Sequence, residues 1–77
     1  MTREVTLYTT AGCHLCEMAE EVLDGCDVRF TPVDIADDPA LIERYGVRIP
    51  VIALPSGREL GWPFDGSAVT AFLAVDI

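Results

Sequence analysis

Apolar and polar side chains divide the first third of the chain into a strand and a helix. Residues 5–9 (VTLYT) alternate in polarity and are rich in β-branched side chains, which predicts a strand. From Cys13 onward apolar residues recur at helical spacing with acidic residues between them, which predicts an amphipathic helix. We expect this helix to end at Gly25 in a left-handed conformation. The helix residues expected to face the core are Leu15, Met18, Ala19, Val22 and Leu23.

The middle of the chain repeats this order of strand and helix. Residues 28–35 alternate on both sides of Pro32. Because proline cannot donate to a ladder, we expect this strand either to lie at a sheet edge or to end its regular pairing at Pro32. Asp38-Pro39 is typical of a helix start, with aspartate as the N-cap and proline in the first turn. The predicted helix has an apolar face of Leu41, Ile42 and Tyr45 and ends at Gly46.

The last third predicts a hairpin followed by a helix. Residues 50–54 (PVIAL) form an apolar run typical of a strand buried on both faces. Residues 55–57 (PSG) predict a turn, and residues 58–60 the returning antiparallel strand. Asp65 is expected to cap a final helix that turns Ala68, Val69, Phe72 and Leu73 inward. The order β-α-β-α-β-β-α describes an α/β chain with one domain over residues 1–77, whose first two β-α units should be parallel neighbours.

Composition narrows the class of protein. A chain of 77 residues has one small core, and its apolar fraction of 51% argues against disorder. No apolar run approaches the roughly 20 residues of a membrane span, and the N-terminus does not resemble a signal peptide. The net charge of −8, with arginines but no lysine, should repel nucleic acid and anionic lipid. We therefore expect a cytoplasmic monomer with no nucleic-acid or membrane partner.

The candidate chemistry lies in Cys13-His14-Leu15-Cys16, at the start of the first helix. Two cysteines one helical turn apart share a face at about 5–6 Å, close enough for a modest adjustment to form a disulfide. The helix N-terminus favours thiolate over thiol at Cys13, which predicts a nucleophile there and a resolving thiol at Cys16. This spacing predicts thiol–disulfide exchange. We expect His14 to be a partly exposed residue that tunes redox poise, and Cys26 a small apolar filler.

The order of elements, with Cys-x-x-Cys between the first strand and helix, resembles the thioredoxin fold in its small glutaredoxin form. The resemblance covers essentially the whole chain and implies a four-stranded mixed sheet flanked by three helices. Ile49-Pro50 matches the family's cis-proline position, which faces the first cysteine, with Arg48 where threonine is common. The backbone N–H and C=O of Ile49 could then pair with an extended thiol substrate. The WPFD segment at residues 62–65 looks like a compact bacterial glutaredoxin-like subgroup.

Two departures from the glutaredoxin pattern lead us to expect weak glutathione binding. Thr10 stands where the family usually has a lysine, and Trp62 stands where it has the second glycine of Gly-Gly-x-Asp. Trp62 either covers the groove for the γ-glutamyl arm or anchors the following helix in the core. Arg48 either replaces the missing lysine as an anion contact or pairs with a nearby carboxylate. The candidate substrate-binding residues are therefore Arg48, Ile49, Pro50 and Trp62.

The resemblance implies an oxidoreductase for protein disulfides or glutathione mixed disulfides. We expect no tightly bound cofactor and treat glutathione as a candidate co-substrate. One alternative is a redoxin of the ribonucleotide-reductase type, which receives electrons from a flavoprotein, thioredoxin reductase. Another is a soft-metal carrier, but those domains run β-α-β-β-α-β, and Cys13 and Cys16 supply only two of zinc's usual four ligands. We accordingly expect no bound metal.

Overall fold

The computed structural model describes residues 4–75 and contains the predicted elements in the predicted order. The strands are β1 (Glu4–Thr9), β2 (Arg29–Asp34), β3 (Val51–Ala53) and β4 (Glu59–Gly61). The helices are α1 (His14–Gly25), α2 (Pro39–Tyr45) and α3 (Gly66–Val75), and a 3-10 turn, η1 (Ile35–Asp37), follows β2. Within this part of the chain, no helix is long and apolar enough to cross a membrane.

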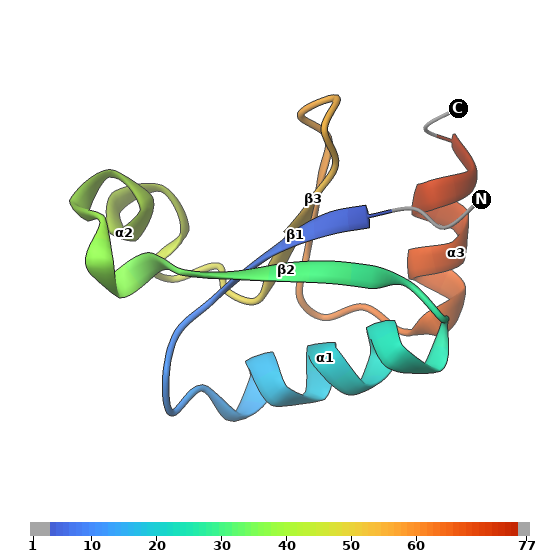
Figure 1. Cartoon of the computed structure of the whole chain (residues 1–77), viewed down its shortest axis with the longest axis horizontal. Helices are drawn as coiled ribbons and strands as arrows, with labels where there is room; N and C mark the ends of the chain where they lie inside the picture. Colours follow the sequence, from blue (N-terminus) through green and yellow to red (C-terminus); the bar gives the residue numbers. More distant parts are fainter. Residues whose placement is uncertain (1–3, 76–77) are drawn as a thin grey trace.

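The four strands form one mixed sheet in the order β2-β1-β3-β4. β1 and β2 are parallel, as predicted, whereas β3 is antiparallel to both β1 and β4. β2 lies at an edge, which confirms the expectation from Pro32. Figure 1 shows α1 and α3 close together, with α2 on the other side of the sheet from α1. The prediction of a mixed four-stranded sheet with three helices is confirmed.

Each face of the sheet has its own apolar cluster. The larger cluster, beneath α1 and α3, contains Val5, Leu7, Ala19, Leu23, Ile52, Leu54, Phe64, Val69 and Phe72. The smaller one, beneath α2, contains Ile35, Tyr45 and Val51. Val51 and Ile52 point to opposite faces and are both fully buried, which confirms that β3 is covered on both sides.

Aspartate side chains cap the starts of α2 and α3, as the sequence predicts. Asp38 Oδ1 accepts the backbone N–H of Ala40 at 2.9 Å, and Pro39 occupies the first turn of α2. Asp65 Oδ1 accepts the N–H of Ala68 at 2.8 Å at the start of α3. These bonds pair backbone donors that a helix start leaves unsatisfied.

Three expectations about local structure are wrong. The left-handed residue after α1 is Asp27, at φ 59°, and Gly25 belongs to the helix. The second strand ends at Asp34, because the Asp34 side chain accepts the N–H of Ala36 and starts η1. Leu15, Met18 and Ile42 are exposed, because they lie at the margins of their helices' apolar faces and the sheet covers only the centre.

Candidate active site

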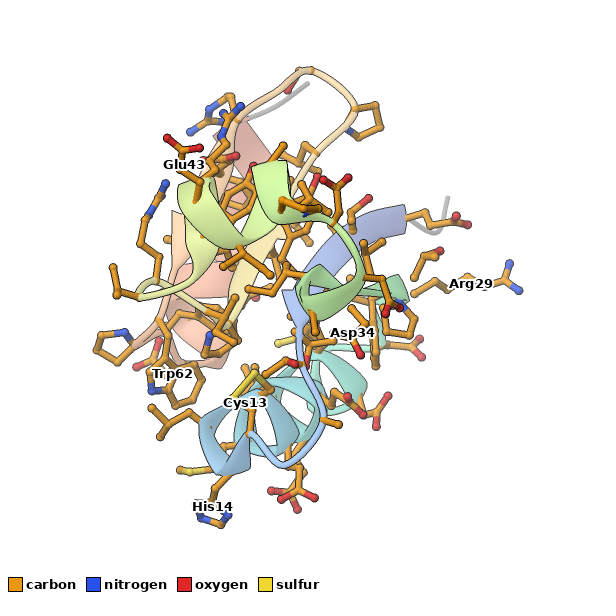
Figure 2. The ribbon with its side chains drawn as sticks, turned by 90° about the vertical axis from the view of Figure 1, so that its left-hand side faces the viewer. Cys13, His14, Arg29, Asp34, Glu43 and Trp62 are labelled. Carbon is orange, nitrogen blue, oxygen red and sulfur yellow. A yellow bond between two sulfur atoms is a disulfide. The ribbon has the colours of Figure 1, made fainter. Side chains whose placement is uncertain are left out.

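Strand register brings four segments to one end of the sheet. Thr9 ends β1 opposite Asp34, the last residue of β2. On the other side of β1, Tyr8 pairs with Val51, so Pro50 lies at the same end. The N–H of Trp62 donates to the carbonyl of Pro50 at 3.0 Å. The turn after β1 leads directly to Cys13, and Figure 2 shows Cys13, Asp34 and Trp62 at this end of the molecule.

The two cysteines of the motif form a disulfide at the start of α1. Their Cα atoms are 5.2 Å apart, and the Sγ of Cys13 accepts the backbone N–H of Cys16 at 3.1 Å. Cys13 is the N-cap residue, so its sulfur lies where the helix leaves N–H donors unpaired. Cys16 is 2% exposed, whereas Cys13 is half-buried. An attacking thiolate therefore reaches Cys13 more readily than Cys16.

The turn before β3 carries the second predicted element. The Ile49–Pro50 bond is cis, as expected, and Pro50 is buried while Ile49 is half-buried. The expectation that the N–H of Ile49 pairs with a substrate is wrong for this conformation, because it donates to the carbonyl of Tyr45 at 3.0 Å. The N–H of Arg48 donates to the same carbonyl at 2.8 Å. The end of α2 therefore holds this turn, and pairing of the Ile49 carbonyl with a substrate stays a prediction.

Glu59 on β4 connects this turn to α2 through a cluster of side chains. Its carboxylate lies 3.3 Å from Arg44 and 3.5 Å from Arg48, and it accepts the Tyr45 hydroxyl. Tyr45 also stacks on Tyr8 of β1, with ring centroids 4.2 Å apart. Of the two roles foreseen for Arg48, the structure shows pairing with a carboxylate. Its contact with a substrate stays a prediction.

Burial, and then the hydrogen bond and negative charge of Glu59, raise the pKa of Tyr45 to about 12 from its usual 10. The folded state thus holds the phenol proton at a pH where the unfolded chain releases it. Stability from this group is complete below pH 10 and is lost as the pH rises toward 12.

Tyr45→Phe should remove that part of the alkaline loss of stability. At neutral pH the substitution should lower the free energy of unfolding by about 1 kcal/mol, because Glu59 loses a hydrogen bond. Urea denaturation of both proteins between pH 8 and 11.5 measures the two effects. Parallel curves for wild type and Tyr45→Phe would show that Tyr45 does not carry the pH dependence.

Trp62 anchors the segment before α3 in the core. Its ring packs edge-on against Phe64, with centroids 5.0 Å apart, and borders the larger apolar cluster. The structure thus supports the anchor interpretation, while the ring stays only half-buried at the disulfide end (Figure 2). The Trp62–Pro63 bond is also cis, which the sequence analysis did not foresee.

The side chains of His14 and Cys26 point away from the Cys13–Cys16 disulfide or lie far from it. The His14 side chain is 83% exposed, and its Nδ1 is 3.6 Å from a Glu17 carboxylate oxygen. Figure 2 shows its ring pointing away from the molecule. Cys26 is a half-buried free thiol whose Sγ donates to the carbonyl of Gly66 at 3.7 Å, consistent with a filler.

Two further features do not add to the site. Among residues 4–75, no three histidine, cysteine or acidic side chains are grouped so as to hold a metal ion. A shallow hollow lies at the other end of α1 and is lined by Asp24, Asp27, Val28, Arg29 and Phe30. We assign no role to this hollow.

The comparisons with known proteins agree with this architecture. A family model described as "Glutaredoxin-like domain (DUF836)" matches residues 4–74. The crystal structure of protein XcR50 from X. campestris superposes with a TM-score of 0.89 and 46% identity, over 92% of this chain and 96% of that one. Uncharacterized protein Rv0508 of Mycobacterium tuberculosis is 31% identical over 80 residues, which span 92% of this chain and 82% of the relative.

A more distant likeness concerns the fold alone. Thioredoxin 1 from Thermosipho africanus superposes with a TM-score of 0.56 and 10% identity, over 95% of this chain and 97% of that one. The expected thioredoxin-like fold is confirmed.

Proposed function

Because this chain belongs to the family of glutaredoxin-like domains, we propose that it is a dithiol oxidoreductase that reduces protein or glutathione mixed disulfides. The observation that carries the proposal is the Cys13–Cys16 disulfide at the N-terminus of α1. One sulfur is accessible and accepts a backbone N–H, and its partner is buried directly behind it. This asymmetry suits a nucleophile and a resolving thiol.

The reaction proceeds in two exchanges. In the reduced protein, the Cys13 thiolate attacks one sulfur of the substrate disulfide, and the other sulfur leaves as a thiolate that takes up a proton. Cys16 then loses its proton and attacks Cys13 Sγ, which forms the Cys13–Cys16 bond and releases the second substrate thiol. Two electrons pass from the cysteine pair to the substrate. The disulfide form seen here is the product of that half-reaction.

A thiol reductant must return two electrons to the oxidised protein. The candidates are two glutathione molecules, which leave as glutathione disulfide, and a flavoprotein reductase. We favour the reductase, because Thr10 provides no positive charge and Arg48 is paired with Glu59. A charge-assisted contact is worth about 1.5–3 kcal/mol, so its loss weakens glutathione binding about tenfold or more.

This choice of donor is tested by incubating the oxidised protein with glutathione, and separately with thioredoxin reductase and NADPH. We expect poor turnover with glutathione. Arg48→Ala should change that turnover less than twofold, because Arg48 is held by Glu59. Robust turnover with glutathione that falls severalfold in Arg48→Ala would instead assign Arg48 to a glutathione carboxylate.

A further inference from the structure

The two sides of α1 beside the disulfide differ in chemistry. At about 100° per residue, the apolar and acidic residues of α1 lie on opposite sides of its buried stripe, Cys16 to Leu23. The apolar side carries Leu15, 45% exposed, and Met18, 39% exposed, in the first two turns. The acidic side is formed by Glu17, Glu20, Glu21 and Asp24. An exposed apolar strip thus begins one residue from Cys16.

Other apolar groups surround the disulfide. Trp62 lies half-buried at the same end of the sheet, and Ile49 is half-buried in the turn before β3. Val47, in the same turn, is fully exposed. Leu15 and Met18 on α1, Ile49 beside Pro50, and Trp62 thus form an apolar rim, contributed by three separate segments, at the disulfide end of the sheet. Exposed apolar side chains gathered around a reactive group are typical of a recognition surface.

The charges near this rim are of both signs, because Arg48 adjoins Ile49 whereas α1 is acidic. Asp34 lies at the disulfide end, and Glu17 lies one turn after Cys13. Among the arginines that the structure describes, Arg44 and Arg48 are bound to Glu59, and Arg58 lies over the Phe72 ring. Arg29 begins β2, at the opposite end of the sheet from Cys13 (Figure 2). Arg44 and Arg48 share one carboxylate, so a positive charge remains on the side of Ile49. The acidic side of α1 is therefore the part of this surface that favours a cationic ligand.

We propose that the substrate disulfide belongs to an extended polypeptide segment with apolar side chains beside its cysteine and lysine or arginine nearby. The apolar side chains lie on Leu15 and Met18, and the basic ones face Glu17 and the other acidic residues of α1. The carbonyl of Ile49 is available to accept an N–H from the segment. This inference rests on the proposed oxidoreductase function and names its substrate class.

The test compares disulfides in a single turnover, which requires no electron donor. The reduced protein is mixed with a synthetic peptide disulfide flanked by leucine and lysine, with a matched peptide flanked by serine and glutamate, and with neutral hydroxyethyl disulfide. We expect the first peptide to oxidise the protein at least about tenfold faster than the second, with an advantage that shrinks as salt is added. Equal rates for the two peptides would overturn this inference alone. Failure to react with all three disulfides would overturn the oxidoreductase function itself.

Surface variants locate the docking site. Leu15→Ser and Met18→Ser should each slow oxidation by the leucine-lysine peptide about fivefold, because each removes about half a side chain of apolar contact. Their rates with hydroxyethyl disulfide, which has no side chains to bind this surface, should fall less than their rates with the peptide. Ile42→Ser is the matched control, since Ile42 is also 45% exposed but lies on α2. An equal loss in Ile42→Ser, or no loss in either α1 variant, would contradict the proposed surface.

Discussion

Cys13→Ser is expected to abolish disulfide reduction, a loss of at least about a thousandfold. The hydroxyl of serine does not ionise near neutral pH. Of the remaining thiols, Cys16 is buried and Cys26 lies at the C-terminal end of α1, away from the helix N-terminus that favours a thiolate. The rate at which the reduced variant consumes a peptide disulfide measures the effect. In the wild-type protein, a limiting amount of alkylating reagent should label Cys13 before Cys16 and Cys26, as read by mass spectrometry.

Cys16→Ser should give a different result from Cys13→Ser. Attack by Cys13 still occurs, but no thiol lies behind it to release the substrate, so a mixed disulfide accumulates and is detected by its added mass. Cys26→Ser is the matched control and should keep wild-type rates, because Cys26 contacts Gly66 rather than the active-site pair. Preferential alkylation of Cys26, or loss of activity in Cys26→Ser, would contradict this assignment of roles.

Ile52→Ala should bring the protein close to unfolding. Ile52 is fully buried in β3, between its partners Leu7 on β1 and Leu60 on β4. Removing three buried carbons and leaving a cavity costs about 2–5 kcal/mol. The total free energy of unfolding of such a small domain is near the low end of about 5–15 kcal/mol. Urea denaturation followed by circular dichroism measures the loss.

The control for this prediction is Val47→Ala. Val47 is fully exposed in the turn between α2 and β3, so its truncation should change the free energy of unfolding by less than about 0.5 kcal/mol. A loss in Ile52→Ala no larger than that in Val47→Ala would show that the centre of the sheet is not the main source of stability.

The sequence predicts the order of elements because each signal is local. Alternation marks β1, Asp38-Pro39 marks the start of α2, and Pro32 marks an edge strand. Burial of the residues at the edges of an apolar helix face is harder to predict, because helical spacing alone does not show how wide a strip the sheet covers. Leu15 and Met18 have the spacing of core residues, yet only the stripe from Cys16 to Leu23 is buried.

The sequence predicts those parts of the candidate site that depend on local motifs, and it does not predict the contacts that depend on packing. The cysteine pair and Ile49-Pro50 are recognisable motifs, and strand register then brings them to one end of the sheet. The hydrogen bond that occupies the N–H of Ile49 depends on how α2 ends, which no motif states. The sequence likewise does not indicate that Glu59 pairs with Arg44 and Arg48. These two arginines come from a different part of the chain, and only the packing of α2 against β4 brings them together with Glu59.

The position of Cys26 keeps it from forming a disulfide with either active-site cysteine in the folded protein. Cys26 caps α1 ten residues beyond Cys16, about 15 Å along the helix axis, whereas a disulfide requires Cα atoms within about 7 Å. The third thiol therefore cannot exchange into the Cys13–Cys16 bond while the helix is intact. The oxidised molecule has one titratable thiol and the reduced molecule has three, with no scrambled isomers between them. In the folded oxidised protein the free thiol should therefore always be Cys26, and an equilibrium redox titration under native conditions should follow a single two-electron curve.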